Sequence, residues 1–251
     1  MKHNGSTPAI AMVTGAASGI GAAATAMLRS RGHRVVACDR DTRITDDPDG
    51  VVLDVTDAGA VERAVADAER RVGPIGVLVN AAGILRAGPL NQTSDADFAA
   101  MFAVNTTGVF AVTRSVTTRM RQRRAGSVVT VASNAGGVPR HGIGGYAASK
   151  AASAHLTKCF GLELAEHGIR CNVVSPGSTD TPMFRSLWPG DGDAAVADAV
   201  TGQPERFRLG IPLGRVADPD DIARVVCFLA SAEAAHLTMQ ELFVDGGASL
   251  R

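Results

Sequence analysis

The residues that decide the fold are Ala9-Ile10-Ala11-Met12-Val13 and the adjoining Thr14-Gly15-Ala16-Ala17-Ser18-Gly19-Ile20-Gly21. The first five have the length and composition of a buried strand, and a helical pattern begins at Gly19. The glycines permit a tight turn and a close approach of a ligand to the backbone, and the start of the helix favours a pyrophosphate group. The stretch predicts the first strand and helix of a dinucleotide-binding sheet, although an ordinary strand-to-helix turn would contain similar glycines.

Beyond this turn, short apolar runs alternate with longer helical patterns, which predicts an α/β fold with a parallel sheet. The expected strands are residues 9–13, 34–38, 51–53, 75–79, 127–132, 169–174 and 242–244. The expected helices are residues 19–31, 57–72, 94–123, 146–167 and 219–230, with Asp57 and Ser94 as N-caps. We therefore expect a single domain over residues 1–251, a doubly wound Rossmann-type sheet of about seven strands with helices on both faces.

One long stretch, residues 181–211, has only a weak pattern and contains the single tryptophan, Trp188. Stretches of this length inside a compact domain are usually functional loops or disordered segments. We expect a substrate lid here, with Trp188 among the residues that contact the substrate.

The composition argues against several kinds of partner. The 251 residues include 25 Lys plus Arg and 25 Asp plus Glu, so the chain has no net charge that would attract nucleic acid or an anionic membrane. No stretch is expected to span a membrane, and the N-terminus is polar. The four cysteines are far apart and have no histidine nearby at a metal-binding spacing. These features predict a cytoplasmic protein with buried free thiols, no metal and a small-molecule partner.

The residue that follows the second strand bears on the choice of cofactor. The Asp39 carboxylate can accept hydrogen bonds from an adenosine ribose, whereas it would repel a 2′-phosphate. Neither Ala17 nor Ser18 supplies a cation to offset that repulsion. Arg40 argues the other way, because a guanidinium can rotate over a phosphate. On balance the sequence predicts NAD.

Three polar residues form a candidate catalytic set. Tyr146, the only tyrosine, and Lys150 stand at i and i+4 of a helical pattern, so they share one face. Ser133 follows the fifth strand, at the edge where open α/β sheets bind ligands. A free phenol has a pKa of about 10, so a tyrosine that accepts an alcohol proton near neutrality needs a nearby cation. A serine hydroxyl can hold the reacting oxygen within reach of that phenol. Taken alone, the pair would more often be a packed tyrosine and a solvated lysine.

Together these residues resemble the short-chain dehydrogenase/reductase family along essentially the whole chain. The matching positions are Thr14 to Gly21, Asp39, Asp54, Asn80 to Gly83, Asn105, Ser133, Tyr146, Lys150, Pro176-Gly177 and Asp245-Gly246-Gly247. The resemblance implies a catalytic tetrad of Asn105, Ser133, Tyr146 and Lys150, in which the asparagine kinks a helix and holds a water that links the lysine to a proton relay. It also implies a homotetramer with a subunit contact near Asp245.

Longer matches, at residues 80–86, 130–133, 170–181 and 209–214, resemble the branch of this family that oxidises 2,3-dihydro-2,3-dihydroxybenzoate. They imply NAD-dependent oxidation of a ring carbinol, followed by enolisation to the aromatic acid, in siderophore or secondary-metabolite biosynthesis. Three alternatives stay open. The substrate could be the 2-amino analogue, dihydro-3-hydroxyanthranilate; the chain could be a generic alcohol or 3-oxoacyl dehydrogenase; or it could be a non-catalytic dinucleotide-sensing scaffold on the same fold.

A cyclohexadiene carboxylic acid carries a negative charge, so its pocket needs a local cation. Arg140 lies between Ser133 and Tyr146, and Arg86 follows the turn at residues 80–83. A planar guanidinium can bind both carboxylate oxygens at once. We expect Arg140 to be the anchor and Arg86 to be the alternative, and either could instead be a surface arginine on a mobile loop.

Two sets of contact residues follow. The residues expected at the cofactor are Gly15, Ser18, Gly19, Ile20, Gly21, Asp39, Asp54, Val55, Asn80, Ala81, Gly83, Lys150, Pro176, Gly177, Thr179 and Thr181. The residues expected at the substrate are Arg86, Ser133, Arg140, Tyr146 and Trp188.

Overall fold

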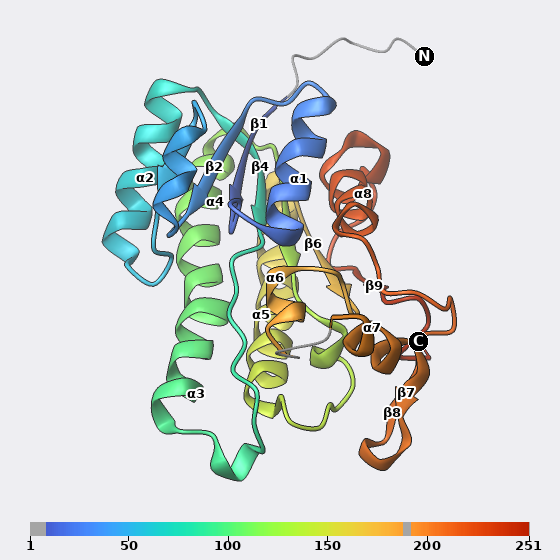
Figure 1. Cartoon of the computed structure of the whole chain (residues 1–251). Helices are drawn as coiled ribbons and strands as arrows, with labels where there is room; N and C mark the ends of the chain where they lie inside the picture. The colour runs from blue at the N-terminus through green and yellow to red at the C-terminus, as the bar shows by residue number, and fades with distance from the viewer. Residues whose placement is uncertain (1–8, 188–191, 251) are drawn as a thin grey trace.

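The computed structural model of the chain describes residues 9–187 and 192–250. Its centre is a seven-stranded parallel sheet with the strand order β3-β2-β1-β4-β5-β6-β9 (Figure 1). The strands are β1 (Ile10–Thr14), β2 (Val35–Asp39), β3 (Gly50–Val52), β4 (Ile75–Asn80), β5 (Gly126–Val131), β6 (Ile169–Pro176) and β9 (Glu241–Val244). Successive strands are added outward from β1 on one side and outward from β4 on the other. Doubly wound sheets bind their ligands in the crevice at such a change of strand order. The predicted α/β fold is confirmed.

Helices pack on both faces of the sheet, and side-chain alternation along each strand divides the core into two layers. In β1, Ala11 and Val13 pack with α1 (Gly19–Ser30) and α8 (Pro219–Ala230). Met12, between them, faces the opposite layer. That layer contains buried residues of α2 (Ala58–Arg71), α4 (Val109–Arg123) and α5 (Gly144–Leu164). Because both faces are covered, the strands are largely apolar, and polar side chains within them such as Thr130 and Asn172 are buried.

The helix predicted over residues 94–123 is interrupted at its middle. It consists of α3 (Asp95–Phe102), a π-helical segment (Ala103–Gly108) and α4. The predicted N-caps are confirmed, since Ser94 accepts from the Asp97 N–H and Asp57 accepts from the Ala60 N–H. A Cβ on Gly108 would stand 2.7 Å from Val55 Cγ2, so a glycine lets the π-helical segment approach the end of β3. The helix is therefore interrupted by π-helical geometry around Asn105, where the family resemblance implies a kink.

The same helix bears on the expectation that no stretch spans a membrane. By length and hydropathy alone, Asp95–Arg123 would pass for a membrane span. Its residues contact α2, α5 and β4, however, and its most apolar window is 39% buried inside the protein. It is a core helix.

The predicted lid region contains short elements that its weak pattern did not reveal. They are α6 (Pro182–Arg185), α7 (Gly192–Thr201) and a hairpin of β7 (Gly202–Gln203) and β8 (Arg208–Leu209). Figure 1 shows them together below the carboxyl ends of the strands. Phe207 turns the hairpin at a positive φ of 52°. Trp188 lies outside the described residues.

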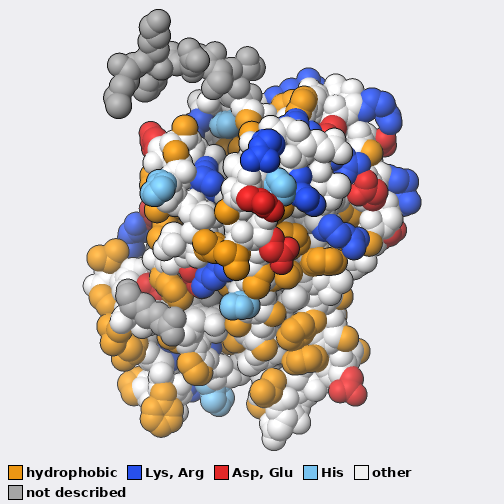
Figure 2. Space-filling model, turned by 180° about the vertical axis from the view of Figure 1, so that it is seen from behind, with side chains coloured by type: hydrophobic (Ala, Val, Ile, Leu, Met, Phe, Trp, Pro, Cys, Tyr) orange, Lys and Arg blue, Asp and Glu red, His pale blue; other side chains and the backbone are white. Residues whose placement is uncertain are grey.

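The surface is uneven in character. Figure 2 shows charged side chains gathered over the upper half of one face and apolar side chains over the lower half. The exposed apolar side chains include Phe98 on α3, Phe110 on α4, Leu162 on α5 and Phe207 on the hairpin. The four cysteines are free, but Cys159 is exposed, so the expectation of buried thiols holds for Cys38, Cys171 and Cys227 only.

Candidate active site

A cavity of about 1120 Å³ opens along the carboxyl edge of the sheet. One end reaches the glycine turn and the end of β2, and the other reaches α6 and the β7-β8 hairpin. The ends of β4, β5 and β6 and the start of α5 lie between them. The cavity is therefore long enough to receive a dinucleotide and a second small molecule beside it.

The glycine turn forms one end of this cavity. Gly15 and Gly19 have φ values of 71° and 53°, a conformation that favours glycine. A Cβ on Gly15 would stand 2.7 Å from the Ala82 backbone nitrogen, so the turn packs directly on the segment after β4. The first turn of α1 is uncharged and its N-terminus lines the cavity. A pyrophosphate fits this end, because a side chain at the glycines would fill the space and the helix offers free N–H groups.

Asp39 is held in place at the same end. Its Oδ2 accepts from the Ala17 N–H at 3.0 Å, and its Oδ1 accepts from the Asp41 N–H at 2.9 Å. Its neighbour Arg40 is exposed and also lines the cavity. Asp54 accepts from the N–H and hydroxyl of Thr56, and these bonds hold the pKa of its carboxyl below the usual range.

Nearly all of the residues predicted at the cofactor line this cavity. They are Gly15, Ser18, Gly19, Ile20, Gly21, Asp39, Asp54, Val55, Ala81, Gly83, Lys150, Pro176, Gly177, Thr179 and Thr181. Asn80 was also predicted at the cofactor, but its side chain is buried in the interior and it is not among the described residues that line the cavity. Its Nδ2 donates to Thr113 Oγ1 at 2.9 Å, so its geometry suits support of the β4 end and not contact with a ligand.

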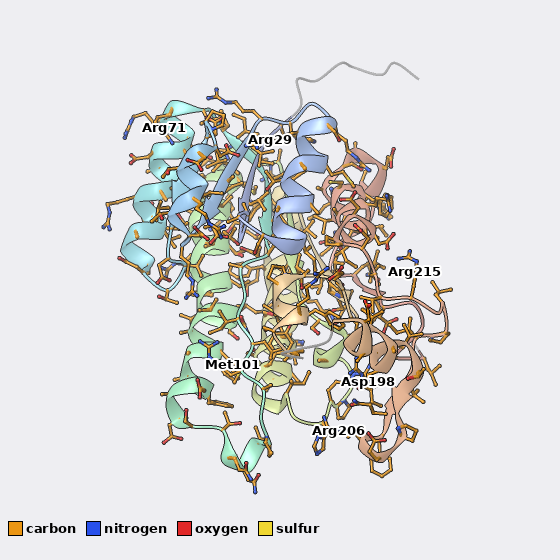
Figure 3. The ribbon with its side chains drawn as sticks, viewed as in Figure 1. Arg29, Arg71, Met101, Asp198, Arg206 and Arg215 are labelled. Carbon is orange, nitrogen blue, oxygen red and sulfur yellow. The ribbon has the colours of Figure 1, made fainter. Side chains whose placement is uncertain are left out.

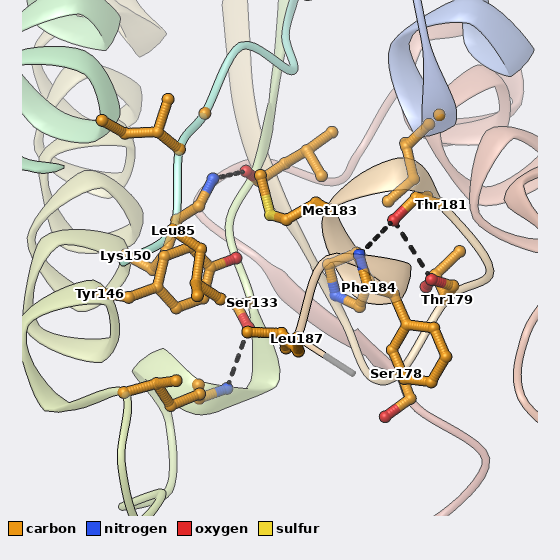
Figure 4. A pocket seen from close by; sticks show the side chains of 18 of the residues that line it. Leu85, Ser133, Tyr146, Lys150, Ser178, Thr179, Thr181, Met183, Phe184 and Leu187 are labelled. Carbon is orange, nitrogen blue, oxygen red and sulfur yellow. Dashed lines mark hydrogen bonds between the residues drawn. The ribbon is translucent and has the colours of Figure 1, made fainter. Parts of the chain in front are cut away.

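Ser133, Tyr146 and Lys150 meet at the middle of the cavity (Figure 4). Ser133 follows β5 and its Oγ accepts from the Ala135 N–H at 3.2 Å. Tyr146 lies in the first turn of α5 with its ring buried beside Ser133. Lys150, one turn later, donates from Nζ to the Val131 carbonyl at 2.8 Å and lies 5.9 Å from the centroid of the Tyr146 ring. The i, i+4 pair therefore shares one face, as predicted.

Burial shifts both titratable groups toward their neutral forms. It raises the pKa of Tyr146 to about 12, although a hydrogen bond with Ser133 acts in the opposite direction. It lowers the pKa of Lys150 to about 8. The phenol is therefore protonated in the free protein, and a cation bound close to it would favour the phenolate.

Asn105 lies just behind these groups. Its Oδ1 accepts from the Ile84 N–H at 2.8 Å, and its Nδ2 donates to the Ile84 carbonyl and to Ser149 Oγ, both at 2.9 Å. A Cβ on Gly83 would lie 3.2 Å from both Asn105 Oδ1 and Lys150 Nζ. Asn105 thus fixes the segment after β4 against α5, while the water implied by the family resemblance stays a prediction.

The two candidate arginines differ in position. Arg140 is half-buried, lines the cavity and donates to the Ala248 carbonyl at 3.2 Å, and burial lowers its pKa. Arg86 is exposed, and its Nε lies 3.4 Å from Asp97 Oδ1. Of the two, only Arg140 is among the described residues that line the cavity. The geometry favours Arg140.

Residues 181–211 were expected at the substrate, but the residues of this segment that line the opposite wall were not named from the sequence. Met183, Phe184 and Leu187 come from α6 and the turn after it, and Figure 4 shows them across the cavity from Tyr146. The hairpin adds Arg208, which is half-buried and donates to Ser178 Oγ at 3.0 Å. The signal that could have found it is the basic-aromatic run at residues 206–208 inside an otherwise weak pattern.

The chain is similar to several proteins of known activity. A family model described as enoyl-(acyl carrier protein) reductase matches residues 15–249. The 2,3-dihydro-2,3-dihydroxybenzoate dehydrogenase of Bacillus subtilis (strain 168) is 46% identical over 261 residues, covering 100% of this chain and 99% of the relative. The enzyme of that name from Escherichia coli (strain K12) is 45% identical over 243 residues, covering 95% of this chain and 96% of the relative.

Solved structures are similar over nearly the whole length. The aldohexose dehydrogenase of Thermoplasma acidophilum superposes with a TM-score of 0.88 at 30% identity, covering 97% of this chain and 94% of that one. Levodione reductase gives a TM-score of 0.88 at 29% identity, covering 97% and 98%. The matches in sequence and structure extend over the glycine turn, the Ser-Tyr-Lys set and residues 181–211 alike, and the chain belongs to the short-chain dehydrogenase/reductase family.

Proposed function

We propose that the chain oxidises 2,3-dihydro-2,3-dihydroxybenzoate to 2,3-dihydroxybenzoate with NAD, in siderophore or secondary-metabolite biosynthesis. The observation that carries the proposal is that a half-buried cation, Arg140, lines the same cavity as Ser133 and Tyr146. A ring carbinol at the hydroxyls and a carboxylate at the guanidinium would both be satisfied there. The full-length identity to enzymes named for this substrate supports the same assignment.

The proposed chemistry assigns a part to each member of the tetrad. Ser133 and Tyr146 hold the substrate hydroxyl, and Tyr146 accepts its proton as the phenolate. When bound, NAD supplies the acceptor for the hydride that leaves the carbinol carbon. Lys150 keeps a positive charge near the phenolate, and Asn105 holds the segment beside it. The ketone then tautomerises as a ring C–H proton moves to its oxygen, which restores an aromatic ring and makes the reaction strongly favourable.

Asp39 supports NAD as the cofactor. Its carboxylate is fixed by two backbone N–H groups at the end of the cavity where an adenosine ribose would lie. A ribose hydroxyl can donate to it, whereas a 2′-phosphate would meet its negative charge. Arg40 is exposed, so its charge is screened by solvent and offsets that repulsion only weakly.

Two further assignments concern architecture. Residues 181–211 act as a lid over the substrate end of the cavity, supported by the lining side chains of α6 and the hairpin.

The chain assembles as a homotetramer, supported by exposed Phe110 on α4 and exposed Leu162 on the adjoining α5. Light scattering after size-exclusion chromatography should give four times the mass of one chain.

A comparison of substrates tests the proposed function. Purified protein with NAD is given 2,3-dihydro-2,3-dihydroxybenzoate, its 2-amino analogue and the corresponding diol without a carboxylate, and kcat/KM is measured for each. We expect the dihydroxy acid to exceed the neutral diol by ~10-fold or more, because a charge-assisted contact contributes about 1.5–3 kcal/mol. A higher kcat/KM for the 2-amino analogue would make that compound the substrate. Equal kcat/KM values for the dihydroxy acid and the neutral diol would show that Arg140 does not bind the substrate carboxylate.

A further inference from the structure

We infer that Arg208, on the β7-β8 hairpin, is a second carboxylate-binding residue and that Arg208 and Arg140 together clamp the acid group of the substrate. This inference rests on the proposed function, because it assigns a site to the carboxylate of the proposed substrate. It adds a specificity residue from the segment over residues 181–211, beside the match at residues 209–214.

Arg208 and Arg140 reach one cavity from segments far apart in the sequence. Arg140 precedes α5 and is tied to the C-terminal segment through the Ala248 carbonyl. Arg208 belongs to β8 and is tied through Ser178 to the segment after β6. Both side chains are half-buried and both line the cavity that contains Tyr146. Two guanidiniums thus belong to the lining of one cavity, and the charge of Arg140 acts on Arg208.

Charged side chains act on both guanidiniums of this pair. Burial and then the positive charge of Arg140 lower the pKa of Arg208, and exposed Asp198 acts in the opposite direction. Arg140 is influenced in turn by Asp245, which is buried and already receives hydrogen bonds from Asn134 Nδ2 and the Gly247 N–H. Like charges held together at reduced solvation repel each other, and an anion between them would relieve that repulsion.

A carboxylate suits this arrangement better than a single charged atom would. It has two oxygens and about four lone-pair directions, so it can accept from two guanidiniums at once. Apolar side chains of Ile84, Leu85 and Met183 pack near the Tyr146 ring and line the cavity beside it. A planar ring would therefore rest on apolar side chains while its acid group faced the arginines. Closing the contact would also bring the hairpin toward the substrate.

Benzoate is a suitable probe, because it has the acid group and a planar ring but contains no carbinol that can react. The Kd of benzoate and of its neutral isostere benzamide is measured by calorimetry on protein saturated with NADH, for the wild type and for Arg208→Met. Arg215→Met serves as the matched control, since Arg215 is exposed, pairs with Asp221 at 2.6 Å and points away from the body of the molecule (Figure 3).

The clamp predicts that the wild type prefers benzoate to benzamide and that Arg208→Met raises the Kd of benzoate by ~10-fold or more. The Kd of benzamide and of NADH should change by less than about twofold, and Arg215→Met should leave benzoate binding unchanged. Arg208→Lys, which keeps the charge but loses the planar fork, should fall between wild type and Arg208→Met.

Three results would overturn the clamp: no preference for benzoate in the wild type, an Arg208→Met effect that is equal for benzoate and benzamide, or no effect at all. If Arg208→Met does not fold, as judged by lost NADH binding, Arg208→Lys decides the matter by the same measurement. Turnover of the dihydro acid is a separate readout. Selective benzoate binding without that turnover would keep the clamp and reject the proposed function.

Discussion

The two walls of the cavity are built differently. The wall with Ser133, Tyr146 and Lys150 consists of buried side chains on β5 and α5, at the centre of the sheet. The wall with α6 and the hairpin is peripheral, and its tip residue Phe207 is 95% exposed. Chemistry requires groups held within a fraction of an ångström, and buried regular elements supply that precision. The choice of substrate can vary on a peripheral segment without disturbing the fold. The comparison predicts that substitutions of Ser133, Tyr146 or Lys150 change turnover for every substrate. Substitutions of the two arginines proposed to bind the carboxylate should instead change the affinity for acids.

The largest effect should come from the first wall. Tyr146→Phe removes the hydroxyl that accepts the alcohol proton, so kcat should fall by at least ~100-fold. The loss should be the same for the dihydro acid and for the neutral diol, and the Kd of NAD should be nearly unchanged. Steady-state kinetics with both substrates checks this, and activity within a few fold of wild type would remove Tyr146 from its role.

The next effect should distinguish substrate binding from catalysis. Arg140→Met removes one of the two guanidiniums proposed to bind the carboxylate, so KM for the dihydro acid should rise by ~10-fold or more with little change in kcat. Turnover of the neutral diol should be nearly unaffected. If both substrates weaken equally, Arg140 acts on the structure of the pocket and the division between the walls does not hold.

A smaller effect is expected at the cofactor end. Asp39→Ser removes the carboxylate that repels a 2′-phosphate, so kcat/KM with NADP should rise and that with NAD should fall, each by roughly 3- to 10-fold. The ratio of the two values, measured at one fixed substrate concentration, is the readout. Equal use of both cofactors by the unmodified protein would contradict the part assigned to Asp39.

The smallest effect concerns stability, and its sign follows from the pKa of Lys150. Burial lowers that pKa from 10.5 to about 8, so the folded protein binds the proton less tightly than the unfolded chain does. The charged lysine therefore destabilises the fold fully below pH 8, and stability is regained between about 8 and 10.5. Lys150→Met should raise Tm by about 2–5 °C near neutrality, even though it impairs catalysis.

The pH dependence provides the control for this measurement. The gain in Tm should shrink when wild type and Lys150→Met are compared at about pH 9.5, because the wild-type lysine then loses its charge in the fold. A variant with a lower Tm than wild type at both pH values would show that the hydrogen bond from Lys150 to the Val131 carbonyl outweighs the burial of its charge.

The same contrast explains what could be predicted from the sequence. The seven strands of the main sheet are largely apolar runs, and Asp57 and Ser94 are explicit start signals. Outside residues 181–211, the main strands and long helices therefore lie within a few residues of their predicted positions. Tyr146 and Lys150 share a helix face, which a spacing of four residues specifies. These features are local in sequence, and tertiary packing does not override them.

The rest depends on contacts that the sequence does not encode locally. Asn80 has the right position after β4, but its side chain turns inward to Thr113, which is 33 residues away in sequence. Arg86 is drawn to Asp97 on the surface. Arg208 reaches the cavity because a short hairpin brings it to Ser178, in the segment after β6, and two-residue strands have no detectable period. Residues 181–211 could therefore be recognised as a separate segment of weak pattern, but their short elements could not be predicted.

The most direct test of the account is to identify the product. Purified protein is incubated with NAD and 2,3-dihydro-2,3-dihydroxybenzoate, NADH is followed by its absorbance, and the organic acids are separated by chromatography. The account predicts one NADH and one 2,3-dihydroxybenzoate formed for each dihydro acid consumed, and no product from Tyr146→Phe on the same timescale. NAD reduction absent from the wild type, or an oxidised product other than the aromatic acid, would contradict it.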